Sequence, residues 1–458
     1  MMRLEPFDFH YARTRAGIAL STPLNLPERG LVWLTGASGS GKSTLLNLIK
    51  GLYPEFIHGT LAGGNPAIAR DALYLSQNPH TQIVHERVGE EFFFSMEHRQ
   101  YTPEQMHAKK YLLEQYGLGD MELKPTAQLS HGQAQRLLLA SMLATEPKVL
   151  LLDEPTAFLD EEIRTEFYQL LNELKQHVCI LLVDHHMQVA EYADVCWHIS
   201  EKGELNKRSP ESWLHETQQA LQQLRAESSL TQTPPPLSAQ ITLSLEQLVV
   251  GYDKKQPLFT ANATLHSGEC TVLCGENGSG KSTLLNTLAG MTKPLGGQCT
   301  LRYQASAEEA PQQIKPREQM MYVFQHPDSH FFFDTVAEEL TQLGVQDIAG
   351  TLAHFGLADC AERSPHQLSE GQKRRLTLLF PVLLQRALIV LDEPTFGQDA
   401  LNAERITQLI RSFKAAGHAL IVITHDATLH RAIADQTWEI RDGELHIHAG
   451  AETEETPR

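Results

Sequence analysis

One feature limits what this chain can fold into more than any other: the same series of motifs occurs twice. A glycine-rich stretch ending in Gly-Lys-Ser-Thr occupies residues 36–44 and returns at residues 275–283, an offset of 239 positions (275 − 36 = 239). Two more motifs return at that offset: Leu-Ser-x-Gly-Gln at 129–133 and 368–372, and Leu-Asp-Glu-Pro-Thr at 152–156 and 391–395. Self-similarity at a fixed period indicates a tandem duplication, so we expect two domains of the same fold.

The repeat also divides the chain, whose 458 residues are enough for several cores. We expect four segments: a first domain at 1–205, a linker at 206–239, a second domain at 240–447 and a solvated tail at 448–458. Within the linker, Trp213, Leu221 and Leu224 fall at helical spacing and predict an amphipathic helix, which a Pro-rich segment follows.

The charge narrows the classes of partner. Lys and Arg total 38 and Asp and Glu total 56, which gives a formal charge of −18. This balance argues against a surface that binds nucleic-acid backbone and against a polybasic membrane anchor. No run of about 20 apolar residues suggests a spanning helix, and no signal peptide is visible, so we expect a cytoplasmic chain.

The glycine-rich motif has the chemistry of a phosphate site. A strand-like run at residues 31–35 precedes it and a helical run at 45–49 follows, which is the context of a P-loop. The glycines let backbone N–H groups converge on phosphate oxygens, and the helix N-terminus adds positive potential. The nucleotide-binding residues predicted here are Gly36, Ser38, Gly39, Gly41, Lys42, Ser43 and Thr44, with Gly275, Asn277, Gly278, Gly280, Lys281, Ser282 and Thr283.

Two carboxylates follow an apolar strand in each half. A buried parallel strand delivers the residues at its carboxyl end to the ligand crevice of an α/β sheet. Asp153 and Asp392 would therefore join Ser43 and Ser282 around Mg²⁺, and the lysines would neutralise phosphate charge. The following residues, Glu154 and Glu393, would orient and deprotonate the attacking water. The predicted fold class is α/β, with two tandem P-loop NTPase domains.

The Leu-Ser-x-Gly-Gln motifs look like helix starts, each with a Ser cap and a Gly. Placed shortly before the Asp-Glu strands, they resemble the signature of the ATP-binding-cassette (ABC) family, and the resemblance covers nearly the whole chain. It implies a RecA-like core with antiparallel β and helical subdomains in each domain. It also implies an intramolecular pseudo-dimer that sandwiches two ATP molecules, one site completed by Ser369 and Gly371 and the other by Ser130 and Gly132.

The resemblance implies roles for further residues. His185 and His425 match the histidine that senses the γ-phosphate, and Gln77 and Gln325 match the glutamine that contacts Mg²⁺ or the attacking water. Tyr11 and Tyr252 would stack on adenine, or could be packing tyrosines, and Asp160 and Asp399 would communicate across the pseudo-dimer. The middle signature position is His131 in one half and Glu370 in the other, which makes the two sites unequal or places both side chains in solvent.

The segments after the loop glutamines resemble the ATPases of energy-coupling-factor (ECF) importers. Gln77-Asn78-Pro79 is followed by Gln82, although the second copy has His330 at the matching position. The resemblance implies uptake of a vitamin, a vitamin precursor or a transition metal ion, with ATP and Mg²⁺ as cofactors. It implies a transmembrane coupling subunit, a membrane-embedded substrate-binding subunit, and a peripheral location on the cytoplasmic side of the cell membrane. The aromatic runs at 92–94 and 331–333 would line the partner's docking groove or belong to a core.

A second reading places the chain among soluble tandem ABC ATPases of the ABC-F type, which act on ribosomes and RNA. Those proteins resemble this chain in their duplication, but they carry a long basic linker that reaches RNA. The linker here is rich in Gln and Pro and the chain is acidic, so we expect no nucleic-acid partner.

Overall fold

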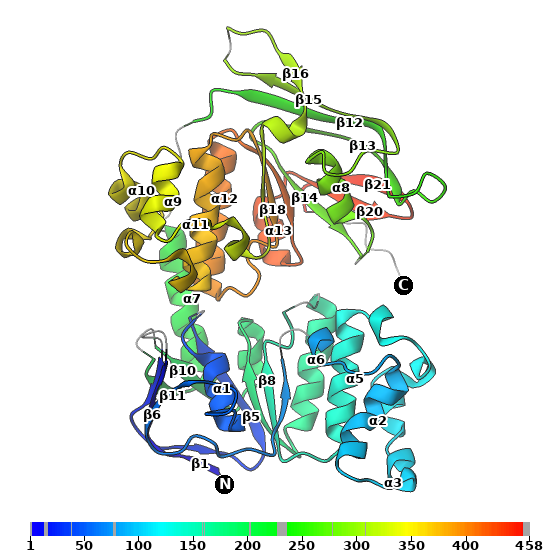
Figure 1. The fold of residues 1–458 in the computed structure, drawn as a ribbon, viewed down its shortest axis with the longest axis vertical. Coiled ribbons are helices and arrows are strands. Elements are labelled where there is room, and N and C mark those ends of the chain that lie inside the picture. The colour runs from blue at the N-terminus through cyan, green and yellow to red at the C-terminus, as the bar shows by residue number, and fades with distance from the viewer. Residues whose placement is uncertain are drawn as a thin grey trace. The chain divides into compact units, whose positions relative to one another are not determined.

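The computed structural model describes residues 2–12, 17–37, 39–76, 79–157, 159, 161–200, 203–226, 236–276, 278–306 and 308–451. The chain forms two compact units, Met1–Ala220 and Leu221–Arg458 (Figure 1). The boundary falls inside one helix, α7 (Pro210–Ala226), within the segment expected to be the linker. No helix in the described ranges is long and apolar enough to cross a membrane.

A six-stranded sheet forms the centre of the first unit. Its strand order is β11-β10-β5-β9-β8-β7, and all neighbours are parallel except β10 and β11. The strands are β5 (Gly30–Gly36), β7 (Leu73–Leu75), β8 (Val149–Asp153), β9 (Cys179–Val183), β10 (Val195–Ile199) and β11 (Leu205–Arg208). Since β11 runs to Arg208, the sheet of the first unit extends past residue 205.

Two small antiparallel sheets and a set of helices complete the first unit. The strands are β1 (Met2–Leu4) with β4 (Leu24–Leu26), and β2 (Phe7–Tyr11) with β3 (Gly17–Leu20) and β6 (Gly59–Gly63). The helices before α7 are α1 (Lys42–Lys50), α2 (Val88–His98), α3 (Pro103–Ala108), α4 (Tyr111–Gln115), α5 (His131–Ala144) and α6 (Glu161–Leu174).

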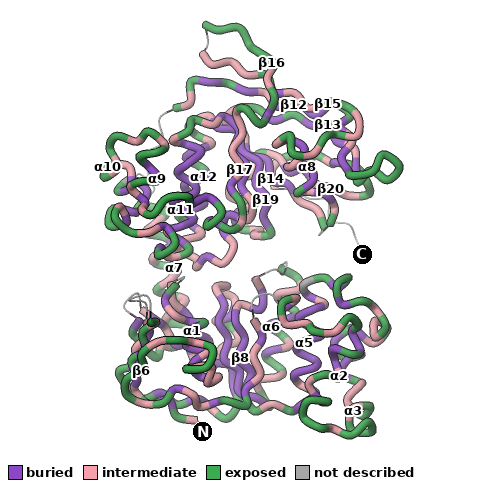
Figure 2. Tube along the Cα trace, viewed as in Figure 1, coloured by how far each residue is buried: buried purple, intermediate pink, exposed green. Residues whose placement is uncertain are grey.

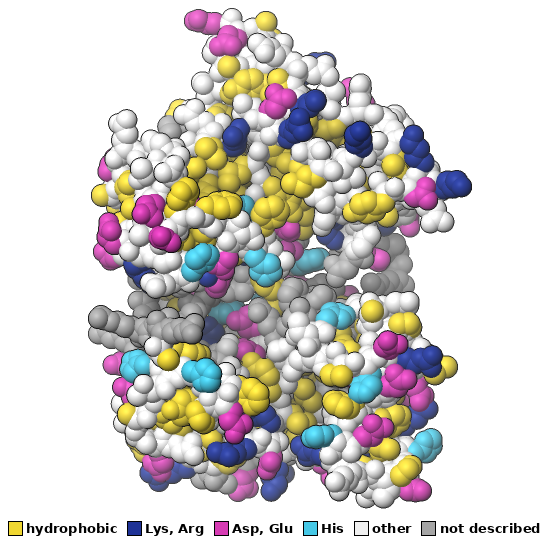
Figure 3. Space-filling model, in the orientation of Figure 1, with side chains coloured by type: hydrophobic (Ala, Val, Ile, Leu, Met, Phe, Trp, Pro, Cys, Tyr) yellow, Lys and Arg dark blue, Asp and Glu magenta, His cyan; other side chains and the backbone are white. Residues whose placement is uncertain are grey.

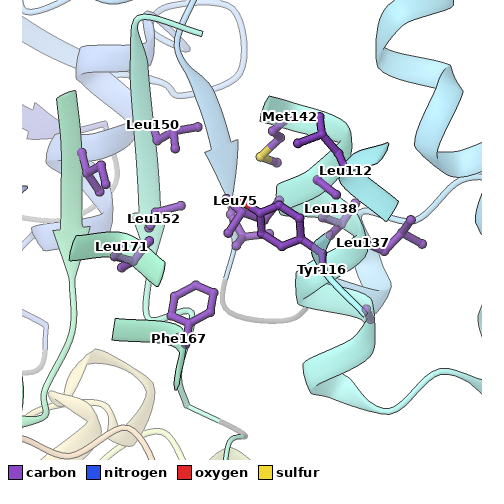
Figure 4. Packing of buried hydrophobic residues seen from close by; sticks show 14 of the residues in the cluster. Leu75, Leu112, Tyr116, Leu137, Leu138, Met142, Leu150, Leu152, Phe167 and Leu171 are labelled. Atoms are coloured by element: carbon purple, nitrogen blue, oxygen red, sulfur yellow. The ribbon is translucent and has the colours of Figure 1, made fainter. Parts of the chain in front are cut away.

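The central sheet is buried on both faces because its side chains alternate between two cores. Leu150 and Leu152 of β8 face the core shared with α5 and α6, whereas Leu151 faces the core shared with α1. Figure 4 shows the first of these cores, where side chains of the strands and helices meet. In Figure 2 the central strands of both units are correspondingly buried.

The second unit repeats this plan with one continuous ten-stranded sheet. Its order is β16-β15-β12-β13-β21-β20-β14-β19-β18-β17, and the pair Thr260–Glu444 joins the antiparallel strands to the parallel core. The strands are β12 (Gln240–Val250), β13 (Phe259–His266), β14 (Cys270–Gly275), β15 (Gly296–Gln304), β16 (Gln312–Ile314), β17 (Met320–Val323), β18 (Leu388–Asp392), β19 (Ala419–Ile423), β20 (Gln436–Arg441) and β21 (Glu444–Ala449). The helices are α8 (Lys281–Leu288), α9 (Val336–Gln342), α10 (Ile348–His354), α11 (Glu370–Leu383), α12 (Ala400–Ala415) and α13 (Ala427–Ile433).

The two units therefore confirm the predicted α/β fold with tandem P-loop NTPase domains. The segments by which the two units differ in length form helices and strands. The second unit has a longer β15 and the added strand β16, and the first unit has a longer α2 and the short helix α3. Each addition extends an edge strand or a helical layer, so the parallel strands that carry the motifs stay alike.

Candidate functional site

Each glycine loop lies between a buried strand and a helix, β5 and α1 in the first unit and β14 and α8 in the second. Gly36 has φ of 145°, and a Cβ at this position would lie 2.5 Å from the carbonyl oxygen of Ile199. Gly275 has φ of 142°, and its Cβ would lie 2.9 Å from a carbonyl oxygen of β20. Both turns therefore require glycine. Ser38 and Asn277 lie outside the described residues.

The lysine that ends each loop folds back over it. Lys42 Nζ donates to the carbonyl oxygens of Gly36 at 3.1 Å and Ala37 at 3.0 Å. Lys281 Nζ makes the equivalent bonds in the second unit at 2.6 and 3.0 Å. Each ammonium group thus lies at a loop and helix N-terminus that already favour an anion. The same loops hold Gly39, Gly41, Ser43 and Thr44, and Gly278, Gly280, Ser282 and Thr283.

A serine and an aspartate provide hard oxygen ligands beside each loop. Ser43 Oγ donates to Asp153 Oδ1 at 3.0 Å, and Asp153 is the last residue of β8. In the second unit Ser282 follows the loop lysine and Asp392 ends β18. Mg²⁺ at a nucleotide is held by one or two such protein oxygens together with phosphate oxygens, so these residues fit that ion. Among the described residues, no group of three or more His, Cys, Asp and Glu could hold a metal without such phosphates.

Two tyrosines that no motif pointed to contact these aspartates. Tyr74 OH donates to Asp153 Oδ2 at 2.7 Å, and Tyr322 OH donates to Asp392 Oδ2 at 2.7 Å. Burial, with the adjacent carboxylate, raises the pKa of each phenol well above its usual value, so each phenol keeps its proton. The sequence did hold a signal, since a tyrosine precedes each of the loop glutamines by three residues.

The glutamates that follow the aspartates have an uncommon backbone conformation. Glu154 has φ of 48° and Glu393 has φ of 46°, in the left-handed region that few non-glycine residues adopt. The N–H of Glu154 donates to the carbonyl oxygen of Val183 at 2.8 Å, and the N–H of Glu393 donates to that of Ile423 at 2.9 Å, each on the neighbouring strand. Backbone strain of this kind is found where a site must hold a side chain in one place. Strands β8 and β18 are therefore each followed by a strained turn that holds the glutamate predicted to be the general base.

The two glutamates differ in their contact with the predicted histidine. His185 Nε2 lies 2.9 Å from Glu154 Oε1, whereas His425 Nε2 lies 3.7 Å from Glu393 Oε1. Burial acts to raise the pKa of Glu154, but the hydrogen bond and charge of His185, with Lys42, outweigh it and lower this pKa. Burial raises the pKa of Glu393 to about 8, against a backbone hydrogen bond from His425.

The two histidines also differ in the aspartate beside them, which precedes the histidine in one unit and follows it in the other. In the first unit Thr156 Oγ1 donates to Oδ2 of Asp184, which precedes the histidine, at 2.6 Å. In the second unit Thr395 Oγ1 donates to Oδ2 of Asp426, which follows the histidine, at 3.0 Å. The anchored aspartate therefore lies before the histidine in the first unit and after it in the second. Side-chain exposure is 11% for His185 and 48% for His425.

We expect the two sites to respond differently to pH. A carboxyl group acts as a base only when deprotonated, and kcat/KM reports the pKa values of the free enzyme. The Glu154→Gln variant, which depends on Glu393 with its pKa of about 8, should gain kcat/KM as the pH rises through that value. The Glu393→Gln variant depends on Glu154, whose pKa is lowered, and its profile should be flat there. Titration of ATP affects both variants alike, so parallel steady-state profiles would contradict this prediction.

The predicted adenine-stacking tyrosines lie beside the phosphate loops. Tyr11 OH lies 2.8 Å from Thr44 Oγ1, and Thr283 Oγ1 donates to Tyr252 OH at 3.2 Å. Tyr252 is 74% exposed, while Tyr11 is partly buried and packs edge-on against Phe9. Each tyrosine therefore contacts a threonine in the first turn of the helix that follows the loop. Stacking of either ring on adenine stays a prediction.

The signature residues begin helices α5 and α11. Ser130 and Gln133 form a reciprocal capping box, and Ser369 and Gln372 form the same box in the second unit. Gly132 and Gly371 follow in the first turn of each helix. Glu370 is half exposed and its carboxylate pairs with Lys373, and the side chain of His131 is outside the described set. Contact of these residues with ATP held by the other domain stays a prediction.

The departure at His330 is explained by a shared backbone role. Gln82 Oε1 accepts a hydrogen bond from the N–H of Ser76 at 2.8 Å, and its amide donates to the carbonyl oxygen of Tyr74. His330 Nε2 accepts from the N–H of Phe324 at 3.0 Å, and burial lowers the pKa of His330 to about 4, so the neutral ring can accept. Both side chains hold the segment that leads to the loop glutamine.

The structure describes only one of the two loop glutamines and only one of the two aspartates predicted to act between the domains. Gln77 and Asp160 lie outside the described residues. The backbone carbonyl oxygen of Gln325 accepts a hydrogen bond at 2.5 Å from the buried side chain of Arg374, a contact that no motif predicted. Asp399 caps α12 by accepting from the N–H of Asn402 at 2.9 Å. Its role between domains stays a prediction.

The fold and these paired loops define a tandem P-loop ATPase. The family model described as "ABC transporter" matches residues 21–157 and 258–396, more than half of the chain. The chain therefore belongs to the ABC transporter family and is an ATPase with two ATP-binding domains.

Sequence relatives are consistent with this family, and a solved structure shares the fold. A Bacillus subtilis (strain 168) protein provisionally named HMP/thiamine import ATP-binding protein YkoD is 31% identical, over 96% of this chain and 90% of its own length. A Methanosarcina acetivorans protein provisionally named ABC transporter ATP-binding protein is 27% identical, over 97% and 89%. The structure named RNase-L Inhibitor has a TM-score of 0.60 and 18% identity over 97% of this chain and 90% of that one, which shows a shared fold.

Proposed function

We propose that this ABC ATPase energises the uptake of a small micronutrient through an ECF-type membrane transporter. The B. subtilis relative supports a vitamin or its precursor as cargo, because its provisional name assigns it to HMP/thiamine import. The resemblance of the segments around Gln77 and Gln325 to ECF ATPases supports the transporter type. A transition metal ion remains the second class of cargo that this transporter type implies.

The observation that carries the proposal is a pair of anchored, apolar segments after the loop glutamines. In the second unit the buried carboxylate of Glu339 accepts from the N–H groups of Phe332 at 2.5 Å and Phe333 at 2.8 Å. Phe332 is 80% exposed, whereas Phe331 packs in the core against Phe380. A rigid backbone that holds aromatic side chains in water is typical of a protein interface.

The first unit has the matching arrangement. Glu91 Oε2 accepts from the N–H groups of Val84 and His85, both at 2.8 Å, and Val84 is 68% exposed. A groove of about 290 Å³ adjoins this segment, lined by His85, Arg87, Gly89, Glu90, Phe93, Glu97, Glu122 and Leu123. Phe92 is buried in the core and Phe94 is partly exposed, so each aromatic run serves both a core and a surface. Figure 3 shows hydrophobic side chains gathered on one face of the second unit.

We assign the two anchored apolar segments, one in each unit, to the binding of helices of a transmembrane coupling subunit. That subunit would in turn hold the membrane-embedded substrate-binding subunit. The ATPase would then lie peripherally on the cytoplasmic face of the cell membrane. Two ATP molecules would be sandwiched between the domains, with Ser369 and Gly371 completing the first site and Ser130 and Gly132 the second. Closure on ATP would move the docked helices, and hydrolysis would reset them.

The residues of each site divide the work of hydrolysis. Lys42 and Lys281 would neutralise phosphate charge, since their ammonium groups already lie over the loops. Mg²⁺, held by the serine and aspartate oxygens, would supply charge stabilisation at the phosphates. Glu154 and Glu393 would orient the attacking water and accept its proton. His185 and His425 would contact the γ-phosphate beside them.

The proposal is tested by purifying the tagged full chain from membranes of its own host in mild detergent. We expect membrane proteins to co-purify in fixed ratio with the ATPase and to be released when the detergent is made harsh. Ribosomal proteins or RNA in their place would overturn the importer proposal and favour the ABC-F type. The similarity to a solved archaeal ribosome recycling factor, at 18% identity, shows the fold alone. The formal charge of −18 opposes an RNA partner.

A further inference from the structure

The two oxygens of Asp153 have different partners. Oδ1 accepts from Ser43 Oγ at 3.0 Å, and this serine is the other proposed ligand of Mg²⁺. Oδ2 accepts from Tyr74 OH at 2.7 Å, and Asp153 is 7% exposed, so water has little access to this oxygen. The phenol thus binds one oxygen of the carboxylate, and the other lies beside the serine that is the second proposed ligand of Mg²⁺.

The second unit has the same phenol–carboxylate bond on different flanking residues. Tyr322 OH donates to Asp392 Oδ2 at 2.7 Å. The neighbours of Tyr322 on β17 are Met321 and Val323, whereas those of Tyr74 on β7 are both leucine. In each unit the tyrosine lies on the strand that pairs with the aspartate strand, β7 with β8 and β17 with β18. The phenol–carboxylate bond is therefore built twice from neighbouring parallel strands.

The number of oxygens that a carboxylate offers matters for the choice between metal ions. Ca²⁺ accepts both oxygens of one carboxylate and has longer bonds and flexible geometry, whereas Mg²⁺ demands a compact octahedron and few protein oxygens. A charge-assisted hydrogen bond to one oxygen uses one lone pair of that oxygen and fixes the plane of the carboxylate, which disfavours binding of a metal through both oxygens at once. This restriction penalises Ca²⁺ more than Mg²⁺.

We propose that Tyr74 and Tyr322 are metal-specificity residues, which fix the carboxylates of Asp153 and Asp392, disfavour metal binding through both oxygens of either one, and so favour Mg²⁺ over Ca²⁺ at the nucleotide sites. The inference rests on the proposed Mg²⁺ sites. The tyrosines act through the aspartates and are positioning residues that touch neither the phosphates nor the attacking water.

The test is metal-dependent nucleotide binding to the full chain. A fluorescent ATP analogue is titrated at equilibrium with MgCl₂ and separately with CaCl₂, for the wild type, Tyr74→Phe, Tyr322→Phe and the double variant. Phenylalanine removes only the donor, so we expect the ratio of half-saturating Ca²⁺ to Mg²⁺ to fall about tenfold in the double variant, from the loss of one bond to a charged group per site. Binding without divalent ions should not change. Tyr116→Phe, a buried tyrosine of the first unit's helical layer, is the matched control.

The outcomes separate this inference from the proposed Mg²⁺ sites. A wild type whose ATP binding is indifferent to divalent ions would contradict the sites themselves. A wild type that requires Mg²⁺, with a Ca²⁺/Mg²⁺ ratio unchanged in the folded double variant, would overturn the role of the tyrosines. Thermal melting reports folding, and if Tyr74→Phe fails to fold, Tyr322→Phe in the other unit provides the same test.

Discussion

The double variant Glu154→Gln, Glu393→Gln is expected to hydrolyse ATP about 10²–10⁴ times more slowly than the wild type, which is the usual contribution of a general base. Glutamine has nearly the shape of glutamate but cannot accept a proton from water. ATP binding should survive, because the loop lysines and helix N-termini that hold the phosphates are unchanged. Phosphate release measures the first effect, and equilibrium binding of a fluorescent ATP analogue measures the second.

Single variants and a control sharpen this prediction. Glu114 and Glu362 are exposed, one in each unit, so Glu114→Gln, Glu362→Gln should hydrolyse ATP at the wild-type rate. A Glu154→Gln, Glu393→Gln variant that keeps more than half of the wild-type rate would refute the role of both glutamates. Equal rates in the two single variants at neutral pH would contradict functional inequality of the sites, whether it arises from His131 and Glu370 or from the unequal histidine contacts.

The second large effect concerns the segment of Phe332 and Phe333, which we assign to docking of the membrane partner. Glu339→Gln should weaken retention of the membrane partner about 100-fold, because one buried carboxylate accepts two backbone hydrogen bonds and each bond to a charged group contributes about 1.5–3 kcal/mol. The amide would keep at most part of this anchor, and the segment bearing Phe332 would lose its fixed position. The measurement is the amount of co-purified membrane protein per ATPase as the detergent extract is diluted. ATP binding by the isolated chain should stay within about twofold, since hydrogen bonds of Glu339 lie outside the loops.

Two further variants distinguish docking from general damage. Glu362→Gln replaces an exposed glutamate in the same unit and should retain the partner fully. Phe332→Ala removes a side chain that is 80% exposed, so it should leave the melting temperature unchanged and still weaken retention. Full partner retention by both Glu339→Gln and Phe332→Ala would show that this segment is not the docking surface.

Local patterns in the sequence were enough to predict much of the fold and the phosphate loops. The apolar run at residues 31–35 followed by glycines predicts a strand and a tight turn, and β5 and α1 lie on either side of the loop. The linker helix was predicted from the spacing of Trp213, Leu221 and Leu224, all of which lie on α7. Such features depend on residues within one or two turns of each other, where backbone sterics and side-chain periodicity decide the outcome.

Contacts that depend on how the chain turns, or on which strands become neighbours, could not be predicted in this way. Tyr74 and Asp153 are brought together only because β7 and β8 are neighbours in the sheet. The buried role of Glu339 depends on the turn of the chain that places two N–H groups against its carboxylate. His330 looked like a departure from its family pattern, yet its ring accepts the backbone hydrogen bond that the pattern's glutamine accepts in the other unit.

The sequence by itself determined that this protein is a duplicated α/β ATPase, because repeated motifs with local chemistry specify loops, strand ends and helix starts wherever they occur. Only the tertiary structure showed that the contact between the histidine and the glutamate differs in the two copies. His185 Nε2 lies 2.9 Å from Glu154 Oε1 and His425 Nε2 lies 3.7 Å from Glu393 Oε1, although each half has both the histidine and the glutamate. The physical reason is that these contacts depend on which strands become neighbours: the fold brings a threonine from another part of the chain against the aspartate that precedes His185 and against the one that follows His425.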